Sequence, residues 1–165
     1  MLILIKQRID GRAKMKDEFI KLDIKDFNKC SNIWNMEKHS ALAEQFHHEL
    51  TSKNRVTYIY KIDENYIAEI SLVFDMKDAD YTIAHQRIYI SRLIVKREYR
   101  RQSIGKRLLS FAIEKAKEMA YKEASIEVDL DNYPALKLYI ESGFDKVICI
   151  DKDDQGAYIK LLKTL

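Results

Sequence analysis

With 165 residues, 47% of them hydrophobic and 33% charged, the chain has the composition of a folded domain and not of an intrinsically disordered protein. Its net charge of +3 is too small to indicate a nucleic-acid-binding protein by itself. Two cysteines, Cys30 and Cys149, lie far apart and fit no metal-ligand spacing, which is typical of a reduced, cytoplasmic protein. Because the chain holds one proline and four glycines, we expect a single domain over residues 1–165 without a long linker.

The first 14 residues are interpreted as an N-terminal extension, since regular patterning begins only near Phe19. Their apolar run, residues 1–5, is too short for the core of a signal peptide or for a membrane span. No later stretch predicts a transmembrane segment, so we expect no membrane partner.

The first half of the chain predicts short strands and helices. Asp26 suits a helix N-cap, because apolar residues follow it at helical spacing as far as Trp34. Runs of β-branched and aromatic residues favour the strands. The predicted elements are a strand at 19–22, helices at 27–34 and 39–50, a hairpin of strands at 56–60 and 66–74, a polar loop at 75–86 and a central strand at 88–95.

The second half contains the strongest helix, residues 104–120, whose apolar residues recur on one face. Ser103 stands directly before it, where its hydroxyl can cap a free backbone N–H group. A later helix starts near Pro134 and ends at Gly143. Further strands are predicted at 124–130, 144–150 and 157–162. This order predicts an α/β (α+β) fold, with a mixed, mostly antiparallel central sheet of about six to seven strands flanked by about four helices.

A basic turn precedes the strongest helix. Six basic residues and one acidic residue lie between Lys96 and Arg107. The free N–H groups and the dipole of a helix start attract anions, and side chains at 100, 101 and 106 add formal charge. Gly105 has no Cβ and lets a ligand approach the backbone closely. The turn therefore predicts either a pyrophosphate site or a solvated basic helix start.

The segment Asn132–Phe144 favours the first alternative, because together with the turn it resembles the GNAT superfamily of N-acetyltransferases. The acetyl-CoA turn of that family has the pattern Arg/Gln-x-x-Gly-x-Gly/Ala, and its later helix has the pattern Asn-x-x-Ala-x-x-x-Tyr-x-x-x-Gly-Phe. The matching residues are Tyr99, Arg100, Gly105, Asn132, Ala135, Tyr139, Gly143 and Phe144. Ser103 departs from the pattern by replacing the first glycine; a serine serves there if its backbone angle is an ordinary one, and its hydroxyl could itself contact a phosphate. The resemblance covers about residues 18–163 and is strong over 88–145, the expected acetyl-CoA-binding and catalytic core.

The resemblance implies acetyl-CoA as co-substrate, no metal, and direct attack of a primary amine on the thioester. Backbone N–H groups of Leu93, Ile94 and Val95 would hold the pantetheine and the carbonyl. Tyr139 would act as general acid toward the departing sulfur, since a tyrosine hydroxyl stays protonated at pH 7. The expected cofactor-binding residues are Leu93, Ile94, Val95, Arg100, Arg101, Gln102, Ser103, Ile104, Gly105, Lys106, Asn132 and Tyr139.

The general base stays open at this point. Tyr89 occupies the place where many relatives carry a glutamate. Glu69 is a substitute candidate, whose alternative interpretation is a plain surface carboxylate, and a chain of water molecules is a third route. Two adjacent histidines, His47 and His48, point to different faces of a helix and do not indicate a metal site.

The acceptor is expected to be an amine on a small molecule or a peptide. Acidic residues in two loops favour a cationic acceptor such as a polyamine or an aminoglycoside; the alternative is that they only keep the loops soluble. They are Asp75, Asp78, Asp80, Asp151, Asp153 and Asp154. A non-catalytic acyl-CoA sensor is the main competing function. We expect no nucleic acid, because only Tyr99 stands among the basic residues of the turn. The assembly is expected to be a monomer or a homodimer.

Overall fold

The computed structural model describes residues 15–165, so the expected N-terminal extension lies outside the described residues. Seven strands and three α-helices alternate with two 3₁₀-helices. They are β1 (Asp17–Lys21), η1 (Ile24–Asn32), α1 (Ser40–Thr51), β2 (Arg55–Ile62), β3 (Asn65–Val73), β4 (Arg87–Val95), η2 (Arg97–Tyr99), α2 (Ile104–Glu118), β5 (Glu123–Asp129), α3 (Tyr133–Glu141), β6 (Lys146–Asp153) and β7 (Gly156–Thr164).

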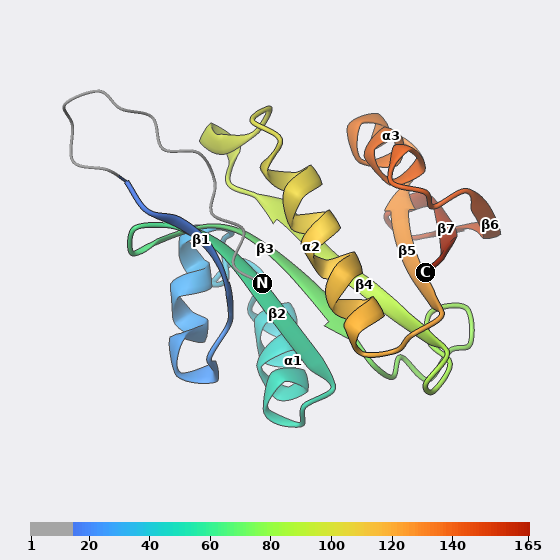
Figure 1. Ribbon diagram of the computed structural model, residues 1–165, viewed down its shortest axis with the longest axis horizontal. Helices are drawn as coiled ribbons and strands as arrows, with labels where there is room; N and C mark the ends of the chain where they lie inside the picture. Colours follow the sequence, from blue (N-terminus) through green and yellow to red (C-terminus); the bar gives the residue numbers. More distant parts are fainter. Residues whose placement is uncertain (1–14) are drawn as a thin grey trace.

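The strands form one sheet in the order β1-β2-β3-β4-β5-β7-β6. Every neighbouring pair is antiparallel except β4 and β5, which are parallel and are joined by α2 as a crossover helix. Figure 1 shows α2 lying across the sheet, with α3 beside it over β5. The predicted mixed, mostly antiparallel sheet with flanking helices is confirmed.

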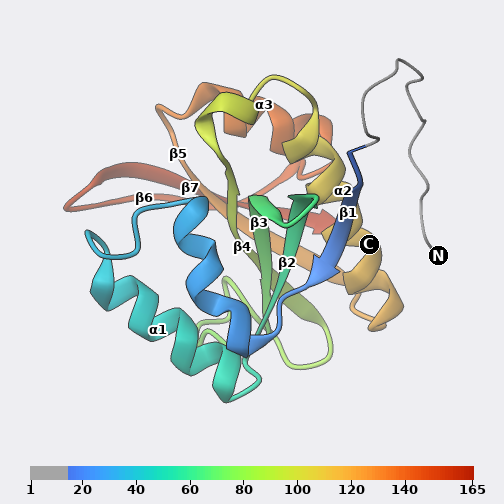
Figure 2. The ribbon, with the colours of Figure 1, turned by 90° about the vertical axis from the view of Figure 1, so that its left-hand side faces the viewer.

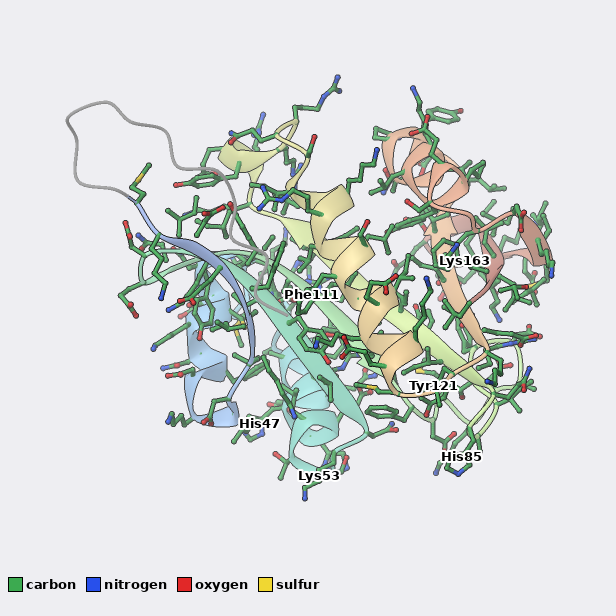
Figure 3. The ribbon with its side chains drawn as sticks, in the orientation of Figure 1. His47, Lys53, His85, Phe111, Tyr121 and Lys163 are labelled. Atoms are coloured by element: carbon green, nitrogen blue, oxygen red, sulfur yellow. The ribbon has the colours of Figure 1, made fainter. Side chains whose placement is uncertain are left out.

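Successive side chains of a strand point to opposite faces of the sheet, and both faces are apolar. Each face therefore has its own hydrophobic core. On β2, Tyr58 and Tyr60 join the larger core under α2, whereas Ile59 joins the smaller core under η1 and α1. Figure 2 shows η1 and α1 on the opposite side of the sheet from α2. Phe111 of α2 points toward β1 and β2, where its ring stacks on Phe19 at 4.9 Å (Figure 3).

The first helix differs from its prediction in type and in start. Asp23, not Asp26, is the N-cap, and its side chain accepts a hydrogen bond from the backbone N–H of Lys25. The segment forms a 3₁₀-helix because its apolar residues Phe27 and Cys30 are three apart, the period of that helix. Among residues 15–165, no helix combines the length and the apolar character needed to cross a membrane.

Candidate active site

The parallel pair at the centre of the sheet is registered over only four residues of each strand. The ladder runs from Arg87 opposite Glu123 to Ile90 opposite Ile126. Beyond this point β4 continues to residue 95 and β5 to residue 129, and the two strands diverge (Figure 1). We call these unpaired ends, residues 91–95 and 127–129, the seam. Because β3 and β7 pair with the outer edges of β4 and β5, the inner edges at the seam are left for another group.

The basic turn and the start of α2 lie at the open end of the seam. Arg100 folds back so that its Nε donates to the carbonyl oxygen of Val95 at 2.9 Å. Arg101 and Ser103 both have positive φ angles, 63° and 61°. The serine hydroxyl makes no capping hydrogen bond, so the sequence-based expectation of a side-chain cap is wrong. A serine is expected to serve here if its backbone angle is an ordinary one, and that condition is not met, since this position is in the left-handed region that favours glycine.

Some basic side chains of the turn make contacts within the protein, whereas others are exposed to solvent. Arg107 is used inside the molecule, because its guanidinium contacts Asp17 at 3.5 Å and lies 5.2 Å from the centre of the Tyr60 ring. In contrast, Arg101 and Lys106 are exposed and form no ion pair with any residue of 15–165. The two exposed charges flank the free N–H groups at the helix start, which is the arrangement that suits a phosphate.

Gly105, in the first turn of α2, lies between β4 and α3. A Cβ built there would be 3.6 Å from Cγ2 of Val95 and 3.9 Å from Cδ2 of Leu138. Both distances are ordinary van der Waals contacts, so the fold itself does not require glycine at this position. Because glycine weakens a helix by roughly 0.5–1 kcal/mol relative to alanine, its presence is a cost without a benefit to the unliganded protein.

Tyr139 reaches the same region from α3. The side chain of Asn132 caps this helix by accepting from the N–H of Ala135 at 3.4 Å. The Tyr139 ring is 7% exposed and packs against Phe144 with ring centres 6.3 Å apart. Burial raises the pKa of the Tyr139 hydroxyl to about 12, so it stays protonated through the physiological range.

A polar cluster that the sequence did not reveal adjoins the seam. Glu127, the first seam residue of β5, accepts a hydrogen bond from the hydroxyl of Tyr81 in the loop between β3 and β4. The rings of Tyr81 and Tyr89 are 4.8 Å apart. Burial, followed by the negative charge of Glu127, raises the pKa of Tyr89, and Tyr139 adds to this effect. Tyr89 therefore lies near both Glu127 and Tyr139.

Sequence patterning could not single out Glu127. It lies between Ile126 and Val128 on a strand whose polar residues suggest a solvated face. The structure covers that face with the loop at 75–86, which Ser125 also holds by donating to the carbonyl oxygen of Tyr81. The contact that distinguishes Glu127 comes from Tyr81, in a loop that is distant in the sequence.

Glu69, the earlier candidate for the base, lies on β3. Its side chain is 5% exposed and its carboxylate is 3.8 Å from the guanidinium of Arg92. The interpretation as a surface carboxylate is therefore wrong. Burial raises the pKa of Glu69, and the positive charge of Arg92 partly opposes that shift.

The acidic loop residues are partly used by the fold. Lys160 of β7 is buried, and its Nζ is 3.7 Å from Asp78 and 3.2 Å from Asp80. Asp75 and Asp153 accept from backbone N–H groups within their own turns. Within residues 15–165 no group of three His, Cys, Asp or Glu side chains is arranged to hold a metal ion.

A cavity of about 460 Å³ opens at the end of β4, on the side of η1 and α1. It is lined by residues 31–37 and 96–98. The cavity walls carry both signs of charge, from Glu37 and Glu98 on one hand and Lys96 and Arg97 on the other. It adjoins the residue that follows the end of β4, Lys96, but none of the seam residues lines it.

Comparison with known proteins agrees with this geometry. The chain is 37% identical over 62 residues to N-alpha-acetyltransferase 30 of Dictyostelium discoideum, covering 38% of this chain and 34% of that protein. It is 29% identical over 100 residues, 61% of each chain, to a "putative ribosomal protein bS18-alanine N-acetyltransferase" of Bacillus subtilis (strain 168). These matches span about a third and about three fifths of the length of the two relatives.

Solved structures share the fold. Aminoglycoside 6'-acetyltransferase type Ii superposes with a TM-score of 0.72 at 15% identity, over 89% of this chain and 96% of that one. A GNAT family acetyltransferase from Elizabethkingia anophelis with acetyl-CoA bound superposes with a TM-score of 0.61 at 23% identity, over 74% and 82%. The family model described as "Acetyltransferase (GNAT) family" matches residues 17–144. The chain belongs to the GNAT acetyltransferase family.

Proposed function

We propose that this protein transfers the acetyl group of acetyl-CoA to a primary amine. One observation carries the proposal: Gly105, at the basic start of α2, lies between Val95 in the unpaired end of β4 and Leu138 of α3, the helix that carries Tyr139. Strand ends with free backbone groups suit an extended ligand arm, and the helix start suits a pyrophosphate. Acetyl-CoA carries both groups.

The cofactor residues are proposed as the sequence suggested. Those N–H groups of residues 93–95 that face the seam would hold the pantetheine arm and polarise the thioester carbonyl, which stabilises the negative charge that develops on its oxygen. The turn at 100–106 would hold the pyrophosphate. Asn132 would contribute indirectly, since its side chain fixes the start of the helix that carries Tyr139.

The chemical step requires two proton transfers. The amine nitrogen attacks the thioester carbon, the carbon–sulfur bond breaks, and the departing sulfur takes a proton from Tyr139. The proton lost by the amine would pass to Glu127, directly or through a water molecule. Glu127 suits this role better than Glu69, because it is half-buried beside the seam whereas Glu69 is enclosed with Arg92.

Two acceptor classes are supported by different observations. Acidic residues around the loops at 75–80 and 151–154 favour a cationic small molecule, although Lys160 neutralises part of that charge. Two relatives whose names describe acetylation of protein amines favour a peptide N-terminus. We retain both classes. The single domain, the cytoplasmic location and a monomer or homodimer remain predictions from the sequence.

The decisive experiment measures thiol release from acetyl-CoA with a panel of polyamines, aminoglycosides, amino acids and peptides with free N-termini. Acetyl-CoA binding is measured in parallel by titration calorimetry. Amine-dependent thiol release is the expected result. Binding without release for every amine would indicate the alternative, a non-catalytic acyl-CoA sensor. Absence of binding would refute both functions.

A further inference from the structure

The strand that borders the seam contains a β-bulge at its first seam residues. Glu69 of β3 pairs with Ile94 of β4, and Ser71 pairs with Ser91. Thus β3 advances by two residues where β4 advances by three, and β4 holds one extra residue. Arg92 lies in this interval with a φ of 63°, in the left-handed region. Such a conformation costs an arginine about 1–2 kcal/mol and has to be held by its surroundings.

The side chain of Arg92 is held on the face of the sheet under η1 and α1. Its Nε is 3.8 Å from Oε1 of Glu69, and its guanidinium carbon is 4.5 Å from the centre of the Trp34 ring. Cys30 closes the same space and is fully buried. The arginine is therefore clamped between a buried carboxylate and an aromatic face, two groups that attract a guanidinium.

This arrangement is costly for the fold. The Arg92 Nε and the Trp34 Nε1 are buried and have no hydrogen-bond partner among residues 15–165. Removing the Glu69 carboxylate from water adds a further penalty, which the raised pKa of this group reflects. Left-handed backbone, an enclosed ion pair and an unpaired donor at one residue are characteristic of a functional position rather than of a stabilising one.

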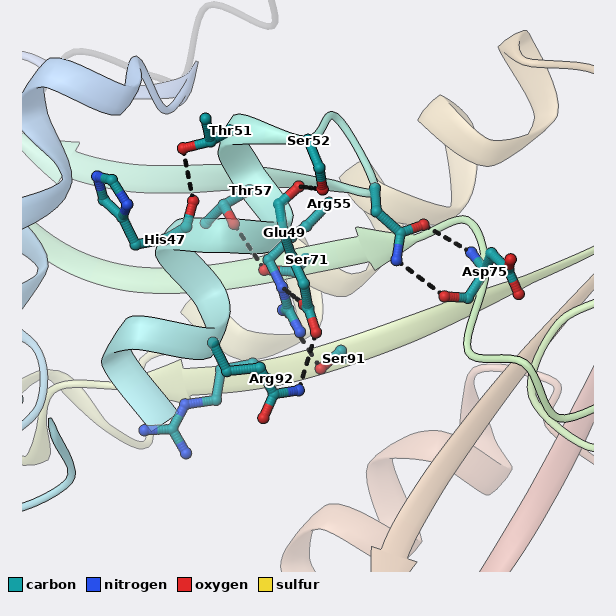
Figure 4. A network of polar contacts seen from close by, with 12 residues as sticks. His47, Glu49, Thr51, Ser52, Arg55, Thr57, Ser71, Asp75, Ser91 and Arg92 are labelled. Carbon is teal, nitrogen blue, oxygen red and sulfur yellow. Dashed lines mark hydrogen bonds and ion pairs between the residues drawn. The ribbon is translucent and has the colours of Figure 1, made fainter. Parts of the chain in front are cut away.

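A second arginine on the same face shows the difference. Arg55 of β2 has its Nε 2.6 Å from Oε2 of Glu49, and its Nη1 is 3.4 Å from Oγ of Ser91 (Figure 4). Its ring contact is with Phe46, at 3.9 Å. Arg55 is fully engaged, and its own φ is not among the positive ones. Only Arg92 of the two arginines combines the ion pair with the bulge.

We propose that Glu69 and Trp34 are positioning residues that act through Arg92. By clamping its side chain they fix the bulge, and the bulge sets the direction of those N–H groups of residues 93–95 that face the seam, toward the thioester carbonyl. This inference rests on the proposed function. Because the Glu69 side chain is enclosed with Arg92 and 5% exposed, the role proposed here differs from that of a general base.

The test uses Glu69→Gln in the full-length protein, with Glu123→Gln as matched control. Both variants remove one carboxylate charge from an ion pair with an arginine of β4, but Arg87, the partner of Glu123, lies at the opposite end of that strand from the bulge. CoA and acetyl-CoA serve as two probes, because only acetyl-CoA has the carbonyl that the N–H groups would contact. We expect Glu69→Gln to lower kcat about 10-fold or more, to leave KM for the acceptor within about twofold, and to weaken acetyl-CoA binding relative to CoA binding. Glu123→Gln should change neither kcat nor the ratio of the two dissociation constants.

Arg92→Gly provides a second variant, since glycine accepts the left-handed angle but cannot be clamped. It should reproduce the loss in kcat even if Glu69→Gln folds poorly. Equal effects of Glu69→Gln and Glu123→Gln, or a raised acceptor KM with unchanged kcat, would overturn the clamp. The clamp alone would be overturned if the wild-type protein binds acetyl-CoA and reacts, but neither Glu69→Gln nor Arg92→Gly changes the ratio of the acetyl-CoA and CoA dissociation constants. The proposed function would stand in that case. A wild-type protein that does not bind acetyl-CoA would overturn both.

Discussion

Replacing Ser103 by glycine should stabilise this protein, against the usual effect of adding a glycine. The residue has a φ of 61°, and its hydroxyl makes no capping hydrogen bond that the substitution would remove. Releasing an L-residue from the left-handed region gains about 1–2 kcal/mol, whereas the greater chain entropy of unfolded glycine costs roughly 0.5–1 kcal/mol. The expected net gain in the free energy of unfolding is therefore about 0.5–1 kcal/mol. For a chain of this size that corresponds to a rise of roughly 1–4 °C in Tm.

The control is Ser110→Gly, because Ser110 is an exposed residue inside α2 where the backbone is helical. The same chemical change there should lower stability by about 0.5 kcal/mol. Thermal and urea unfolding followed by circular dichroism would measure both variants. A fall in Tm for Ser103→Gly comparable with that of Ser110→Gly would refute the reasoning. A loss of acetyl-CoA affinity in Ser103→Gly would instead show that the hydroxyl contacts the phosphate.

Four further predictions concern the site. Gly105→Ala should raise the free energy of unfolding of the free protein by about 0.5–1 kcal/mol and weaken acetyl-CoA binding. Thermal unfolding would measure the first effect and titration calorimetry the second. Unchanged affinity would count against this helix start as the cofactor site. Tyr139→Phe should lower kcat about 10²–10⁴-fold with cofactor affinity retained. Because the pKa of Tyr139 is about 12, the wild-type rate should show no decline from loss of this proton up to pH 10. A basic limb below that pH that vanishes in Tyr139→Phe would contradict the raised pKa, whereas a wild-type rate in Tyr139→Phe would contradict the role as general acid. Glu127→Gln should lower kcat more at neutral pH than at high pH, where more of the amine is already deprotonated, and a pH-independent loss would indicate a structural role instead. If the acceptor is a polycation, kcat/KM should fall as salt is raised, and Asp154→Asn should reduce that dependence; a rate indifferent to both would exclude charge attraction.

The elements that sequence patterning predicted best are those in which one face is buried against the sheet. The helix at α2 was predicted from its apolar stripe, and the stripe residues Leu108 and Ala112 are completely buried. The hairpin of β2 and β3 followed from β-branched and aromatic runs around a polar turn. Both signals are local, so the sequence carries them within a window of a few residues.

The features that escaped prediction depend on contacts between distant segments. The side chain of Glu127 meets Tyr81, 46 positions earlier, and Glu69 is enclosed by Arg92 and Trp34 from other elements. Neither contact produces a periodic pattern in the sequence. The left-handed φ angle of Ser103 could not be predicted from the residue type, since a serine before a helix more often caps the helix start. Only the missing glycine of the family pattern hinted at it.

The short ladder between β4 and β5 has a mechanical consequence. It divides the sheet into two antiparallel blocks, β1–β4 and β5–β7, which share four registered residue pairs. Each block is held internally by longer ladders, so the junction is the part of the sheet with the fewest hydrogen bonds to break. A molecule that bridges the two inner edges acts as a missing strand and couples the unfolding of one block to the other. A ligand concentration of 100 times the dissociation constant would raise the free energy of unfolding by about 2.7 kcal/mol. That is a large fraction of the roughly 5–15 kcal/mol by which an ordinary domain is stable.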